Sequence, residues 1–67
     1  MPEKWTGVLI GKMHNNRINR SDLAEELGVT EAYVSMVLNG KRKPDGIRKR
    51  MEDAVAAIID RRKAASE

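Results

Sequence analysis

The stretch RSDLAEELGVTEAYVSMVLNGKRKP, residues 20–44, decides the fold of this 67-residue chain. It holds two short runs of residues whose apolar members recur at helical spacing, with a glycine between the runs. Asn19 and Thr30 are residues that cap helix starts, and Gly28 is typical of a helix end. The pattern predicts two short helices joined by a tight turn, together spanning about residues 20–39.

Five residues of this stretch jointly meet the requirements of a helix–turn–helix motif. The motif needs a small residue where its helices pack closely, a glycine for positive φ in the turn, an apolar plug, and two inward residues on the second helix. The residues in these places are Ala24, Gly28, Val29, Val34 and Val37. Each match alone is weak, but the joint spacing is specific because few other helical hairpins need that glycine in that place.

Apolar residues before this stretch also recur at helical spacing, and no segment alternates as a strand would. Trp5, Val8, Leu9 and Met13 predict an earlier helix over about residues 4–14. A break follows in the sequence HNNR, because asparagine favours turns over helix interiors.

A last helix is predicted from Asp45 to about Arg62, since Pro44 prevents simple continuation of the preceding helix. Its inward stripe consists of Ile47, Met51, Ala54, Val55 and Ile58. The length leaves room for one domain over residues 1–67. We therefore expect an all-α fold, a compact bundle of four helices that contains the helix–turn–helix and ends in a longer C-terminal helix.

The segment from Arg20 to Pro44, with the preceding Ile18 and Asn19, resembles the Xre-type helix–turn–helix domain of lambda-like phage repressors and many small bacterial regulators. The resemblance covers about residues 5–47. It implies a helical DNA-binding domain, commonly dimeric, whose third helix enters the major groove. Arg20 departs from the family, which usually has a phosphate-contacting glutamine at that position. The family also often has a further short helix after the fourth, and here one longer C-terminal helix is expected in its place.

The resemblance implies base contacts from the outward face of the recognition helix, at Glu31, Ala32, Tyr33 and Met36. A glutamate can accept from a cytosine amino group, and an alanine methyl can contact a thymine methyl. Each has an alternative: Glu31 suits the helix dipole, Tyr33 can pack its ring over a neighbouring helix, and Met36 can contact a partner. The helix lacks Arg, Lys and Gln, so we expect modest base readout.

Positive charge follows the recognition helix directly. Residues 1–40 hold four basic and five acidic residues, whereas residues 41–67 hold nine basic and five acidic ones. Such local charge favours contact with phosphates, although a basic cluster can also complement a helix dipole. The expected DNA backbone contacts are Arg20, Ser35, Asn39, Lys41, Arg42 and Lys43. We interpret Arg61, Arg62 and Lys63 as a solvated charge cluster that complements a helix dipole.

The composition argues against several other classes. The chain has no cysteine and only one histidine, His14, so disulfides and the usual metal sites are not expected. No constellation typical of an enzyme, a cofactor or a small-molecule ligand is present. Without an apolar run of membrane length or a signal peptide at its polar start, the chain is expected to be cytoplasmic, with no membrane partner.

The sequence thus predicts a sequence-specific DNA-binding transcriptional regulator, repressor-like, that binds double-stranded DNA. A homodimer on a palindromic operator is expected because one motif spans few base pairs. The expected dimer contact is the C-terminal helix, through Val55, Ile58 and Ile59. An antitoxin-like module that binds a partner protein is the alternative.

Overall fold

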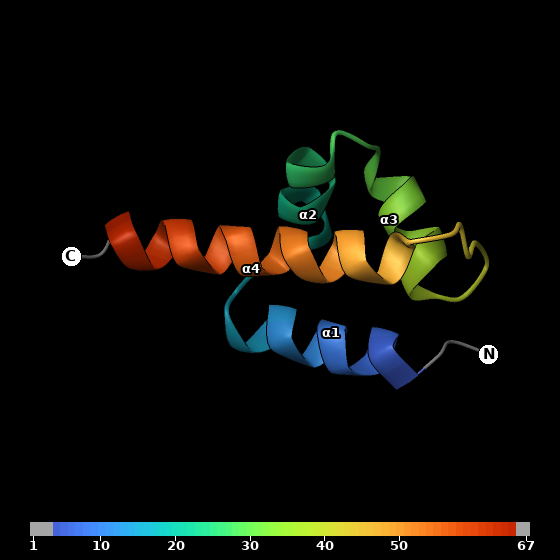
Figure 1. The fold of residues 1–67 in the computed structure, drawn as a ribbon, viewed down its shortest axis with the longest axis horizontal. Coiled ribbons are helices and arrows are strands. Elements are labelled where there is room, and N and C mark those ends of the chain that lie inside the picture. The colour runs from blue at the N-terminus through green and yellow to red at the C-terminus, as the bar shows by residue number, and fades with distance from the viewer. Residues whose placement is uncertain (1–3, 66–67) are drawn as a thin grey trace.

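The computed structural model describes residues 4–65, which form four helices and no strand. The helices are α1 (Lys4–Asn15), α2 (Arg20–Leu27), α3 (Glu31–Leu38) and α4 (Ile47–Ala65). The long α4 runs through the middle of the molecule, with α2 and α3 to one side and α1 to the other (Figure 1). The predicted all-α bundle with a longer C-terminal helix is confirmed.

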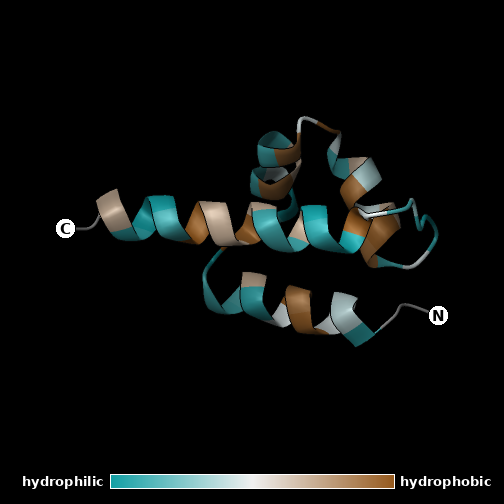
Figure 2. Ribbon diagram, in the orientation of Figure 1, coloured by the Kyte–Doolittle hydropathy of each residue, from teal (hydrophilic) through white to brown (hydrophobic). Residues whose placement is uncertain are grey.

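All four helices contribute to one apolar core. The fully buried members are Leu23, Val34, Val37, Leu38, Met51 and Val55. Hydrophobic and hydrophilic residues are interleaved along each helix (Figure 2), as expected where one side of every helix is buried. All five residues of the predicted C-terminal stripe are buried. Burial of each large side chain contributes about 1.5–3 kcal/mol of transfer free energy, and this holds α2 against both α3 and α4.

The predicted first helix is confirmed by α1, but one of the four apolar residues that indicated it does not face the core. Val8 is 73 % exposed, whereas Thr6, Leu9 and Met13 are buried. Adjacent residues of an α-helix point about 100° apart, and in α1 the core takes Leu9 and leaves its neighbour in solvent. The hydrophobic band in the middle of α1 (Figure 2) is therefore partly open to solvent. Trp5 is half-buried against the core.

The last helix begins later than predicted. Gly46 has φ 74°, a left-handed conformation that lies outside the right-handed helical region. Helix α4 therefore starts at Ile47 rather than at Asp45, and it continues three residues past Arg62 to Ala65.

Burial on α4 corrects the predicted dimer contact. Val55 is 0 % exposed and Ile58 is 4 % exposed within the single chain. Ile59 is half-buried and also packs against the core. Val55 and Ile58 are needed to hold α4 against the other helices, so neither is available to a second copy of the chain.

Candidate nucleic-acid interface

The turn between α2 and α3 has the predicted geometry. Gly28 adopts φ 72° and ψ 33°, the left-handed conformation. Its amide donates to the carbonyl oxygen of Glu25 at 3.3 Å, and the amide of Val29 donates to that of Ala24 at 3.0 Å. These two bonds pair carbonyls that the end of α2 would otherwise leave without a partner. The turn therefore holds α2 and α3 in a defined relation.

Side-chain caps start both helices of the motif. The amide of Asp22 donates to Asn19 Oδ1 at 2.8 Å, and the amide of Asn19 donates to Asp22 Oδ2 at 3.1 Å, which is a complete capping box. Thr30 Oγ1 accepts from the amide of Tyr33 at 3.1 Å and so caps α3. The predicted caps are confirmed, and the capping box adds a role for the Asp22 carboxylate.

Helix α3 turns one face to the core and the other to solvent. Val34, Val37 and Leu38 are buried, which fixes the rotation of the helix about its axis. The candidate base-contacting residues Glu31, Ala32 and Met36 are exposed, Met36 at 36 %. Tyr33 and Ser35 are half-buried, and the Tyr33 ring packs against the core. This agrees with the alternative interpretation of Tyr33, in which its aromatic ring packs against the rest of the fold.

The basic loop is folded back onto the end of α3. The amides of Lys41 and Arg42 both donate to the carbonyl oxygen of Met36, at 2.8 and 3.3 Å. Gly40 makes this reversal possible with φ 77°. Asn39 and residues 41–43 are exposed, so four of the six predicted backbone-contacting residues lie together in this accessible segment, whereas Arg20 is on α2 and Ser35 is half-buried on α3.

A cation–π contact links this loop to the outward part of α3. The guanidinium carbon of Arg42 lies 6.0 Å from the centroid of the Tyr33 ring, at the limit of a favourable cation–π distance. Sequence reasoning assigned these two residues separate roles and missed the contact. The nine-residue separation of the pair follows no helical repeat, so only the folded loop reveals it.

Arg20 stands at the first position of α2 and is exposed, as a phosphate-contacting residue must be.

A second basic cluster, residues 48–50 at the start of α4, is partly compensated by acidic residues of the same helix. Arg48 pairs with Glu52 at 3.3 Å and Lys49 pairs with Asp53 at 3.8 Å. Two of the cations at the start of α4 are thus paired with carboxylates of the same helix.

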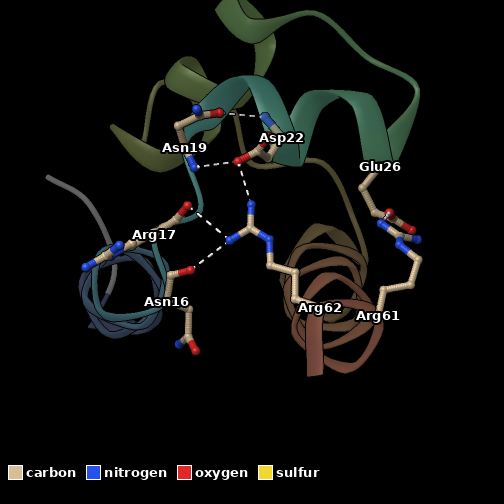
Figure 3. Close-up of polar contacts among 7 residues, drawn as sticks. All are labelled: Asn16, Arg17, Asn19, Asp22, Glu26, Arg61 and Arg62. Atoms are coloured by element: carbon tan, nitrogen blue, oxygen red, sulfur yellow. Dashed lines mark hydrogen bonds and ion pairs between the residues drawn. The ribbon is translucent and has the colours of Figure 1, made fainter. Parts of the chain in front are cut away.

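Arg61 and Arg62 are exposed surface charges, as interpreted from the sequence, but each also makes contacts across the fold. Arg62 reaches from α4 to the corner between α1 and α2, and Arg61 pairs with Glu26 on α2 (Figure 3). The hydrogen bond and charge of Glu26 raise the pKa of the Arg61 guanidinium above its already high ordinary value. Both arginines therefore bind α4 to the helix–turn–helix, a contact for which the sequence contains no periodic signal.

Within residues 4–65 there is no group of three or more His, Asp or Glu side chains placed to hold a metal ion. Over the same residues, no helix combines the length and apolar character that crossing a bilayer requires.

Comparison with known proteins gives one match. A family model described as "Helix-turn-helix" matches residues 15–48, just over half of the chain, from the end of α1 to the start of α4. Neither the curated proteins nor the solved structures that were searched contain a match. The matched segment includes the capped helices, the glycine turn and the basic loop described above. The chain belongs to the Xre-type, lambda repressor-like helix–turn–helix family of DNA-binding domains.

Proposed function

We propose that the chain, acting as a single domain, is a sequence-specific DNA-binding transcriptional regulator that inserts α3 into the major groove. The observation that supports this most directly is that outward residues of α3, Arg20 at the start of α2 and the three cations after α3 are all exposed. Arg20 precedes α3 in the chain, and residues 41–43 follow it. A helix with an accessible face and basic flanks suits a groove whose two edges are phosphate backbones.

Base readout would come from Glu31, Ala32 and Met36, which are exposed on α3. Glu31 would accept from a cytosine amino group, and Ala32 would contact a thymine methyl. Tyr33 would contribute the exposed part of its ring, since the remainder packs on the core. These groups offer few bidentate hydrogen bonds, so sequence preference would be modest and helped by DNA shape.

Most of the affinity would come from phosphate contacts. Lys41, Arg42 and Lys43 would displace counterions along one backbone, and Arg20 along the other. Ser35 and Asn39 would add neutral hydrogen bonds near the same phosphates. The stacking of Arg42 on Tyr33 would orient its guanidinium and so connect the phosphate contact to the reading helix.

The protein would bind a palindromic operator as a homodimer, because one helix–turn–helix contacts only a few base pairs. Its interface does not use Val55 or Ile58, which the core occupies. Ile59, which is half-buried, is the one residue of the predicted contact that retains accessible surface.

Selection of bound duplexes from a random pool, followed by anisotropy titrations at several salt concentrations, tests the proposal. We expect an enriched palindromic sequence whose affinity falls steeply with salt. Lys41→Ala should reduce the slope of log K against log salt by about 1, as expected for one lost phosphate contact. Lys63→Ala removes the same charge near the far end of α4, and it should leave the slope unchanged.

Failure of the wild-type chain to bind any duplex would overturn the proposal. Equal effects of Lys41→Ala and Lys63→Ala would overturn the assigned role of the loop, because they would show that only total charge matters.

A further inference from the structure

The side of α3 that points away from the core carries two apolar residues. Ala32 and Met36 are both exposed and lie four residues apart, so their side chains are neighbours on one face of the helix. Each is two residues from Val34, which is 0 % exposed. Two residues correspond to a rotation of about 200° around an α-helix, so both side chains point almost directly away from the core. The centre of the outward face therefore offers no charge and no hydrogen-bond donor.

The basic loop is attached to the same part of α3. The amides of Lys41 and Arg42 donate to the carbonyl oxygen of Met36, and the side chains of residues 41–43 are exposed. A partner that covers the Met36 side chain would therefore lie near three cationic groups. An apolar protein surface placed there would take these groups out of water without offering them a negative charge, which is costly. The surroundings of Met36 thus favour a polyanion that also exposes apolar groups.

The major groove of DNA exposes one kind of apolar group, the C5-methyl of pyrimidines. Thymine carries this methyl group, and 5-methylcytosine carries the same group at the same ring position. Apolar side chains contact it, and the unbranched, flexible side chain of methionine adapts well to such a small group. The Cβ atoms of residues four apart on a helix are separated by about 5–6 Å, which is less than two base steps of about 3.4 Å each. Ala32 and Met36 can therefore contact methyl groups on neighbouring bases.

We propose that Ala32 and Met36 form a methyl-reading strip on α3, which recognises C5-methyl groups of pyrimidines in the major groove, whether thymine or 5-methylcytosine carries them. The inference rests on the proposed function and specifies what the centre of the recognition helix contacts. Met36 supplies most of the contact, because its side chain is much longer than that of Ala32. Methylation of a cytosine that faces the strip therefore strengthens binding.

The experiment measures the Kd of the full chain for its selected duplex by anisotropy, with single bases altered at the methyl group. Deoxyuridine replaces each thymine in turn, which removes the methyl group and keeps the base pair. At a thymine that faces the strip, this change should weaken binding by about fourfold, as expected when one methyl group loses its apolar contact. When a C·G pair replaces the T·A pair at that position, 5-methylcytosine should bind about fourfold more tightly than cytosine.

Met36→Ala tests whether the Met36 side chain makes the contact. For at least one thymine that responds, the ratio of the deoxyuridine and thymine Kd values should fall from about fourfold to below about twofold, because the contact that distinguishes the duplexes is lost. Val8→Ala is the matched control, since it also shortens an exposed apolar side chain, but on α1. It should leave both Kd values and their ratio unchanged. Circular dichroism verifies that both variants fold.

Equal binding of the thymine and deoxyuridine duplexes at every position would overturn the inference while leaving the proposed function standing. A full response to deoxyuridine at every such position in Met36→Ala would overturn the assignment of the contact to Met36. Equal binding of cytosine and 5-methylcytosine at the responding position would overturn the extension to methylated cytosine. A wild-type chain that binds no duplex would instead overturn the proposed function itself. If Met36→Ala does not fold, the altered duplexes with the wild-type chain decide the matter.

Discussion

Gly28→Ala and Gly11→Ala are the same chemical change at two open positions, and we expect them to shift stability in opposite directions. A Cβ added at either glycine meets no atom within 4 Å, so crowding contributes to neither effect. Gly28 has φ 72° in the turn between α2 and α3, whereas Gly11 lies inside α1. The backbone conformation alone therefore distinguishes the two substitutions.

The magnitudes follow from the conformational preferences of alanine. A left-handed alanine costs roughly 1–2 kcal/mol, and the reduced freedom of the unfolded alanine chain offsets about 0.4–1 kcal/mol of this. Gly28→Ala should therefore lower the free energy of unfolding by about 1 kcal/mol. Gly11→Ala should raise it by about 0.8–1 kcal/mol, because glycine is a poor residue inside a helix.

Thermal unfolding followed by circular dichroism measures both effects in one series. For a chain of this size, 1 kcal/mol corresponds to a Tm change of about 4–8 °C, so the two variants should differ by about 10 °C. A Tm for Gly28→Ala equal to or above that of wild type would refute the requirement for a left-handed turn. A lowered Tm for Gly11→Ala would refute the solvent-facing position of that residue on α1.

Two further stability predictions test the core and the caps. Leu23→Ala removes a side chain that is 0 % exposed and should lower the free energy of unfolding by about 2–5 kcal/mol. Val8→Ala, at a side chain that is 73 % exposed, should change it by less than about 0.5 kcal/mol. If the urea unfolding curves of the two variants coincided, the outward position of Val8 on α1 would be contradicted. Asn19→Ala removes the acceptor of the Asp22 amide and should cost about 1 kcal/mol, with faster hydrogen exchange at that amide, and unchanged exchange would show that the cap contributes nothing.

The elements that sequence predicts well are those in which neighbouring residues decide the structure. Asn19, Gly28 and Thr30 each act within three to five residues of their partners, so the motif was predictable. The stripe on α4 was equally clear because it repeats over several turns. The exposure of Val8 was not predictable, because Leu9, its neighbour, gives an equally good helical spacing and only packing chooses between them.

The contacts that sequence did not predict join residues far apart in the chain through long, polar side chains. Arg62 bonds to groups 40 to 46 residues earlier, and the Arg42–Tyr33 contact depends on how the basic loop folds back. The position of an arginine in a helical repeat does not show whether its side chain stays in solvent or contacts another helix. Such contacts need the relative placement of the helices, which local patterns do not provide.

The most direct test of the proposed function is to titrate the isotope-labelled chain with its selected duplex and to follow backbone amide shifts by NMR. The largest changes should fall at Arg20, on the exposed face of α3 and in residues 41–43. The C-terminal turns of α4 should change little. Changes concentrated on α1 or at the end of α4, with α3 unaffected, would contradict the assignment of α3 as the recognition helix.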